Sequence, residues 1–160
     1  MLPINKILVP IDVSGVSLSD LSRKALSWAS SFARECCAIV YLMAVVENIE
    51  SMYDAYEEEN ILTERKARAF APVNEILDEA EKQAKDMGIQ CMIRVAEPGV
   101  PYQKIIELAD NEKIDLIIMG THGRTGISRL LAGSVTEEVI RHAPCPVLVC
   151  PTAHPDHRTK

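Results

Sequence analysis

The apolar run Ala38–Val46 places the strongest limit on the fold of this chain. It is rich in β-branched residues and contains no charged side chain. A run of this length and composition predicts a strand that is buried on both faces, as in a parallel sheet. Further strands are predicted at Ile4–Ile11, Asp115–Met119 and Pro146–Cys150, and an alternating pattern predicts an edge strand at Ile89–Val95.

Segments with apolar residues at helical spacing separate these strands. The predicted helices are residues 17–35, Ile61–Met87, 101–111 and Ser134–His142. Strict alternation of strands and helices predicts one α/β domain, residues 1–150, built on an open, twisted, parallel five-stranded sheet with helices on both faces. Residues 151–160 are expected to form a disordered tail.

Local signals set the expected ends of these helices. Ser17 and Asp20 have the spacing of a capping box at the start of the first helix. Gly88 is expected to end the second helix, and Pro72 is expected to kink or split it. The acidic stretch 47–60 is interpreted as a mobile loop, with a lid over a ligand as the alternative.

The segment between Gly120 and Thr136 is rich in glycine and lies between a predicted strand and a predicted helix. Glycine lets backbone N–H groups approach an anion, and the helix dipole favours negative charge at this point. The spacing is neither that of a P-loop nor that of a dinucleotide fingerprint. The segment therefore predicts a nucleotide site of another kind. Ser134 and Glu137 also match a capping box, which would need no ligand.

This segment resembles the nucleotide loop of the universal stress protein family, in its ATP-binding branch. The stretches Lys6–Asp12 and Ala143–Val149 extend the resemblance over nearly the whole chain. The resemblance implies the strand order 3-2-1-4-5, binding of ATP with Mg²⁺ and a role as a nucleotide-dependent regulator of the stress response. It also implies a homodimer through the last strand, at Val147, Leu148 and Val149.

With that strand order, a ligand is expected between the first and fourth strands, beyond their carboxyl ends. Asp12 would bind the ribose or the adenine amine, or else cap the following helix. The resemblance implies that the backbone at Val45, or at Val46, faces adenine. The predicted nucleotide-binding residues are Pro10, Ile11, Asp12, Val45, Met119, Gly120, Thr121, His122, Gly123, Arg124, Gly133, Ser134, Val135 and Thr136.

No catalytic residue is predicted, and His122 is interpreted as an exposed loop histidine. The chain lacks a Walker lysine. We therefore expect the negative charge of the phosphates to be offset by Arg124, by the helix dipole and by Mg²⁺, which the phosphates themselves would mainly hold. Binding or slow hydrolysis is therefore expected in place of fast phosphoryl transfer. A protein-interaction module with incidental nucleotide, and a slow ATPase, are the alternative functions; cyclic AMP is an alternative ligand.

Composition narrows the partners and the compartment. The net charge is −6 and no basic run is present, so nucleic acids and anionic membranes are poor partners. The sequence shows neither a membrane-spanning stretch nor a signal peptide, and a cytoplasmic protein is expected. The five cysteines include no Cys-x-x-Cys pair and are expected to be buried or partly buried thiols.

Overall fold

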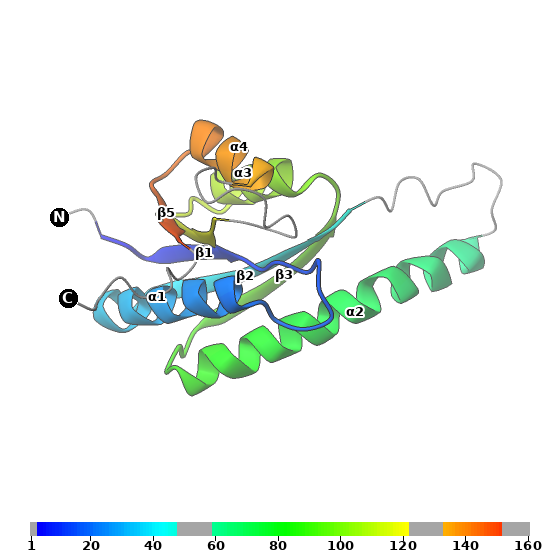
Figure 1. Ribbon diagram of the computed structural model, residues 1–160, viewed down its shortest axis with the longest axis horizontal. Coiled ribbons are helices and arrows are strands. Elements are labelled where there is room, and N and C mark those ends of the chain that lie inside the picture. Colours follow the sequence, from blue (N-terminus) through cyan, green and yellow to red (C-terminus); the bar gives the residue numbers. More distant parts are fainter. Residues whose placement is uncertain (1–2, 48–58, 122–132, 152–160) are drawn as a thin grey trace, which may run out of the picture.

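The computed structural model describes residues 3–47, 59–121 and 133–151 (Figure 1). Its elements are β1 (Lys6–Pro10), α1 (Asp20–Cys36), β2 (Ile39–Val46), α2 (Glu59–Asp86), β3 (Met92–Pro98), α3 (Pro101–Asn111), β4 (Leu116–Gly120), α4 (Ser134–His142) and β5 (Val147–Cys150). All strand pairs are parallel, and the strand order is β3-β2-β1-β4-β5. The α/β class and the strand order expected from the sequence are confirmed.

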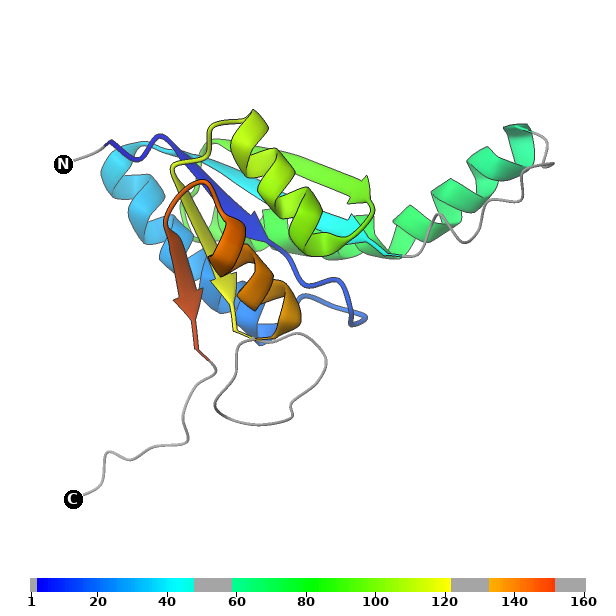
Figure 2. The ribbon, with the colours of Figure 1, turned by 90° about the horizontal axis from the view of Figure 1, so that it is seen from above.

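Two apolar cores lie on the two faces of the sheet. α1 and α2 cover one face, and α3 and α4 cover the other (Figure 1). The strand β2 supplies both cores, because Val40 and Leu42 point to one face while Tyr41 and Met43 point to the other. This double burial is the reason for the uninterrupted apolar run that β2 shows in the sequence. The N-terminal half of α2 extends beyond the sheet (Figure 2).

The start of α1 differs from the prediction, because Ser19 and not Ser17 caps this helix. The hydroxyl of Ser19 accepts a hydrogen bond from the backbone N–H of Ser22 at 3.2 Å. Leu18, which lies between Ser17 and Ser19, is buried in the core and therefore fixes where the chain can enter the helix. α1 accordingly begins at Asp20, three residues later than the capping-box interpretation placed it.

The helix α2 runs unbroken through Pro72, so the predicted split is wrong. It begins at Glu59, inside the stretch that was interpreted as a loop, and the turn after it has Gly88 at a φ of 89°. The backbone N–H of Ile89 then binds the carbonyl of Ala84 at 3.0 Å. Ile89 therefore closes the end of the helix and buries its side chain there, and it does not start a strand.

For the same reason β3 is shifted along the chain relative to the prediction of Ile89–Val95. It spans Met92–Pro98, because Glu97 and Pro98 still pair with the end of β2. It does lie at an edge of the sheet, as its alternating pattern predicted. Among the cysteines, Cys36, Cys37 and Cys91 are exposed, contrary to expectation, because they lie where the chain leaves α1 and approaches β3. The loop and lid hypotheses for 48–58, and the tail 152–160, fall outside the described residues.

Candidate functional site

A cleft of about 530 Å³ opens at the carboxyl ends of β1, β2 and β4. This volume lies within the range that is typical of small-molecule sites. Ten of the predicted residues line it: Pro10, Ile11, Asp12, Val45, Met119, Gly120, Gly133, Ser134, Val135 and Thr136. Thr121 lies next to the lining, and His122, Gly123 and Arg124 fall outside the described residues.

The cleft exists because β1 ends before β2 does. The N–H of Ile11 makes a hydrogen bond of 2.7 Å to the carbonyl of Met43, and no residue of β1 pairs with β2 beyond this point. Successive residues of a strand direct their backbone groups to opposite neighbours. The carbonyl of Val46 binds Gly99 on the β3 side at 3.1 Å, so the N–H and carbonyl of Val45 point to the vacated β1 side. Val45, and not Val46, therefore offers the cleft a backbone donor and acceptor that no described residue binds.

The Asp12 carboxylate lies where β1 ends. Its Oδ1 accepts the N–H of Ser14 at 3.0 Å, and the Asp12 N–H donates to the buried Ser22 hydroxyl at 3.1 Å. Asp12 does not cap α1, since Ser19 has that role. No described residue donates a hydrogen bond to the second carboxylate oxygen of Asp12, so this oxygen remains available to a ligand.

The first turn of α4 faces the same cleft. Gly133 is its N-cap and makes no side-chain cap, while Ser134 is already helical, so the predicted capping box of Ser134 and Glu137 is wrong. The first N–H groups of a helix have no partner within the helix and carry the positive end of its dipole. The hydroxyl of Thr136 donates to the carbonyl of Gly120 at 3.0 Å, and this bond fixes the turn against the end of β4.

The glycines of this site have different physical roles. A Cβ atom on Gly120 would lie 2.9 Å from the Cβ of Leu21, so any side chain here would force α1 or the end of β4 to move. Gly133 has a φ of −60°, which any residue can adopt. A side chain at Gly133 would affect the cleft by the space it fills and not by backbone strain.

The chain matches the family model described as the universal stress protein family over residues 3–151. The chain belongs to the universal stress protein family. It is 38% identical to the universal stress protein MJ0531 of Methanocaldococcus jannaschii, over 90% of this chain and 80% of that protein.

Solved structures show the same fold. The structure of MJ0577, from the same archaeon, has a TM-score of 0.78 at 29% identity and covers 96% of this chain and 100% of its own. A universal stress protein solved in complex with cAMP has a TM-score of 0.69 at 26% identity, covering 95% of this chain and 100% of that one.

The electrostatics of the described lining are set by backbone groups and two carboxylates. Asp12 and Glu47 line the cleft, and no lysine or arginine does so within the described ranges. The same ranges contain no cluster of three His, Cys, Asp or Glu side chains that could hold a metal ion. None of the helices in those ranges has the length and apolar character needed to cross a membrane.

Nearly half of the lining residues were not predicted from the sequence. They are Val13, Ser14, Leu21, Ser22, Met43, Glu47, Val73, Pro101 and Ile105. Most of them reach the cleft from helices or from the segment before α1, so their place depends on packing. Only Ser14 carried a usable signal, because an Asp-x-Ser sequence at a strand end is typical of an Asx turn.

Proposed function

We propose that this universal stress protein binds an adenine nucleotide, ATP together with Mg²⁺, in the cleft between β1 and β4. The observation that carries this proposal is the meeting of three complementary features in one cleft. These are the free backbone edge of Val45, the available oxygen of Asp12 and the uncapped first turn of α4. The relative solved in complex with cAMP supports an adenine nucleotide as the ligand class.

Each feature suits one part of the nucleotide. The donor and acceptor of Val45 match the acceptor and amine along the edge of adenine. The apolar side chains of Met43 and Ile105 offer surfaces for the base. The Asp12 carboxylate would accept hydrogen bonds from ribose hydroxyls, and the N–H groups at the start of α4 would bind phosphate oxygens.

Mg²⁺ would offset the charge of the phosphates, because the charged side chains in the described lining, Asp12 and Glu47, are both negative. Ser134, at the start of α4, presents an exposed hydroxyl near the expected phosphates, whereas the Thr136 hydroxyl proton is already bonded to Gly120. The described lining thus suits binding and orientation of the phosphates, with Mg²⁺ held mainly by the nucleotide itself. We infer a regulator whose state depends on the bound nucleotide, acting in the cytoplasm, where its five free cysteines suit a reducing environment.

We further propose that the protein is a homodimer joined through β5. The carbonyl of Pro146 accepts the N–H of Ile117 in β4 at 3.0 Å, and the carbonyl of Cys150 accepts the N–H of Thr121, just after β4, at 3.1 Å. By alternation, the backbone groups of Val147 and Val149 point to the open edge of the sheet. An open edge of this kind is satisfied by pairing with its two-fold copy.

The test is to denature the purified protein and identify what it releases by chromatography and mass spectrometry. Adenine triphosphate in the extract, and calorimetric binding of Mg²⁺–ATP with competition by cAMP, are the expected results. A protein that releases no nucleotide and binds none would contradict the proposal and favour an interaction module. Turnover of the bound ATP would identify a slow ATPase.

A substitution at Gly133 tests where the phosphates bind. Gly133→Val should abolish ATP binding in a folded protein, because a branched side chain would occupy the phosphate position next to Ser134. Since the φ of Gly133 is −60°, the fold itself should tolerate this change. Unchanged affinity in the folded variant would place the phosphates elsewhere.

A further inference from the structure

Residues 12–18 lie between β1 and α1, and we call them the cleft loop; three of them, Asp12, Val13 and Ser14, line the cleft. Its start is fixed by the bond from the Asp12 N–H to Ser22. Its middle is open, because Gly15 and Ser17 are exposed and Val16 is fully exposed. The position of the cleft loop therefore depends on how its two ends are held.

The far end of the cleft loop is held by α2. The backbone N–H of Leu18 donates to Oε2 of Glu79 at 2.9 Å. The other oxygen, Oε1, accepts a short hydrogen bond and ion pair from Nη2 of Arg23 on α1. Nη1 of Arg23 then donates to Gln83, one turn further along α2, at 2.7 Å. Both carboxylate oxygens of Glu79 are thus used, and the arrangement joins α1, α2 and the cleft loop.

Glu79 keeps its charge at neutral pH. The Leu18 N–H, and then Arg23, hold the pKa of the Glu79 carboxyl below its ordinary value, against the opposing effect of burial. The side chains of Glu79 and Arg23 are 37% and 38% exposed, so solvent screens the ion pair. The directed bond to the backbone of Leu18 is therefore the contact with the larger structural consequence.

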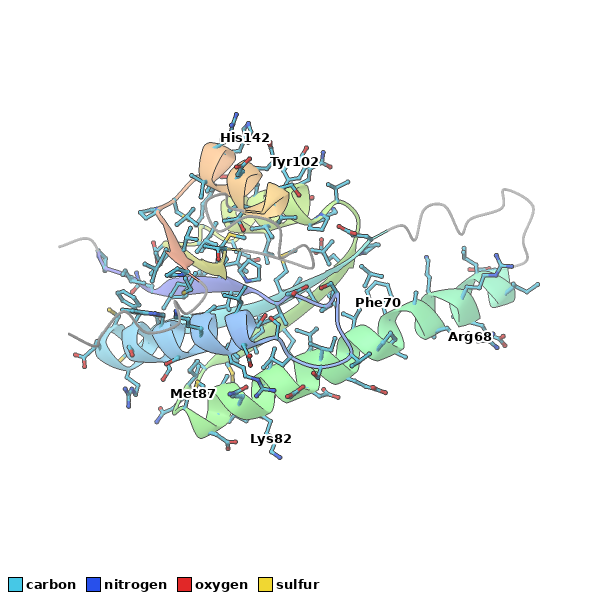
Figure 3. All side chains as sticks on the ribbon, in the orientation of Figure 1. Arg68, Phe70, Lys82, Met87, Tyr102 and His142 are labelled. Atoms are coloured by element: carbon cyan, nitrogen blue, oxygen red, sulfur yellow. The ribbon has the colours of Figure 1, made fainter. Side chains whose placement is uncertain are left out.

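The same helix reaches the cleft directly, because Val73 is part of the lining. Lys82, on another side of α2, points away from the body of the molecule (Figure 3). α2 therefore supplies a wall of the cleft at Val73 and the anchor of the cleft loop at Glu79, further along the same helix.

We propose that Glu79 is a positioning residue for the nucleotide cleft, because its carboxylate fixes the end of the cleft loop and so holds Asp12 and Ser14 in place. The inference rests on the proposed function for the identity of the ligand. The hydrogen bond to Leu18 stands independently of it. Losing this anchor lets the cleft loop sample other positions, and the ligand must then order the loop when it binds.

The chain offers a matched control at the preceding residue of α2. Asp78 pairs with Arg94 of β3 at 2.5 Å, and Arg94 also contacts Glu81 at 3.3 Å. This ion pair joins α2 to the sheet in the same way but has no contact with the cleft loop. Asp78→Ala therefore removes an ion pair of α2 without releasing the cleft loop.

The experiment compares the full chain with its Glu79→Ala, Glu79→Gln and Asp78→Ala variants by calorimetric titration with Mg²⁺–ATP and by amide hydrogen exchange without nucleotide. Glu79→Ala should raise the Kd about three- to tenfold, the range for losing one charge-assisted hydrogen bond that acts indirectly. It should also speed exchange at Leu18. Glu79→Gln should show smaller effects, since its amide oxygen can still accept the Leu18 N–H. Asp78→Ala should stay within about twofold of the unmodified chain.

Wild-type affinity in folded Glu79→Ala, or an equal loss in Asp78→Ala, would overturn the proposal. If Glu79→Ala does not fold, Glu79→Gln takes its place, with weakened binding and faster exchange at Leu18 as the expected result. If the unmodified chain binds no adenine nucleotide, the proposed function fails. In that case the rate of amide hydrogen exchange at Leu18 is the test of whether Glu79 holds the cleft loop. An unchanged rate in the Glu79 variants would refute this role.

Discussion

Replacing Gly120 with alanine tests the packing that forms one wall of the cleft. The added Cβ would lie 2.9 Å from the Cβ of Leu21 and 3.4 Å from its Cδ1. Carbon atoms in contact prefer a separation of about 3.5–4.0 Å, so α1 or the end of β4 must move by roughly 0.5–1 Å. Because the nearest atom is a Cβ fixed to the helix backbone, rotation of the Leu21 side chain cannot relieve the contact.

The expected cost follows from two opposing effects. Overpacking of this kind destabilises a folded protein by about 1–3 kcal/mol. Alanine also restricts the unfolded chain, which returns about 0.4–1 kcal/mol where the native backbone suits it. We therefore expect Gly120→Ala to lower the free energy of unfolding by about 1–2 kcal/mol, measured by urea denaturation with an unchanged m-value.

Two comparisons isolate the cause. Gly15→Ala adds a Cβ whose nearest neighbour is the Ser17 carbonyl oxygen at 3.5 Å, so it should be close to neutral. Gly120→Ala should cost less when it is measured in a Leu21→Gly background, which removes the atom in conflict, and should keep its cost in a Leu21→Ala background, which retains that atom. A neutral or stabilising Gly120→Ala would refute the packing argument.

Further substitutions test the contact of Asp12 with the nucleotide, the proposed dimer interface and the pH dependence of stability. Asp12→Ala should weaken adenine nucleotides by about 1–3 kcal/mol in calorimetry while barely affecting inorganic triphosphate, and equal losses would indicate an effect on folding. Val149→Pro removes an N–H that points to the open edge, so light scattering should show a folded monomer. Leu148→Pro, in contrast, should disrupt the pairing of β4 with β5. A dimer that persists in Val149→Pro would place the interface elsewhere. The Tyr41 hydroxyl donates a hydrogen bond to Glu112 at 2.9 Å and holds the pKa of the Glu112 carboxyl below its ordinary 4.5. The ionised carboxyl therefore stabilises the folded protein above pH 4.5, and this stabilisation is lost as the pH falls through the lower pKa of the folded state. Glu112→Gln should flatten this part of the urea midpoint's pH dependence, and an unaltered profile would contradict the assignment.

The sequence predicted the fold because burial leaves a direct trace in it. A strand covered on both faces must be apolar throughout, and β2 shows this along its whole length. Helix and strand ends were less predictable where competing hydrogen bonds decide them. Ser17 and Ser19 are equally suitable caps by residue type, and only the burial of Leu18 and its bond to Glu79 distinguishes between them.

The candidate site was predictable where it consists of backbone at strand ends, and less so where it depends on packing. The strand order and the parts given to Asp12 and Val45 came from the family resemblance, and the strand order then places both residues at the crevice where it reverses. The need for glycine at position 120 comes from the approach of Leu21 on α1, which no local pattern encodes. The anchor at Glu79 lies 61 positions from Leu18, so it could not be found before the helices were placed.

A crystal structure of the protein grown with ATP and Mg²⁺ would test the proposed nucleotide site directly. We expect adenine hydrogen-bonded to the N–H and carbonyl of Val45, ribose at Asp12, and phosphates at the N–H groups of Ser134 and Val135. Nucleotide bound away from these groups, or a cleft that stays empty at saturating ATP, would show that the site is not the one proposed.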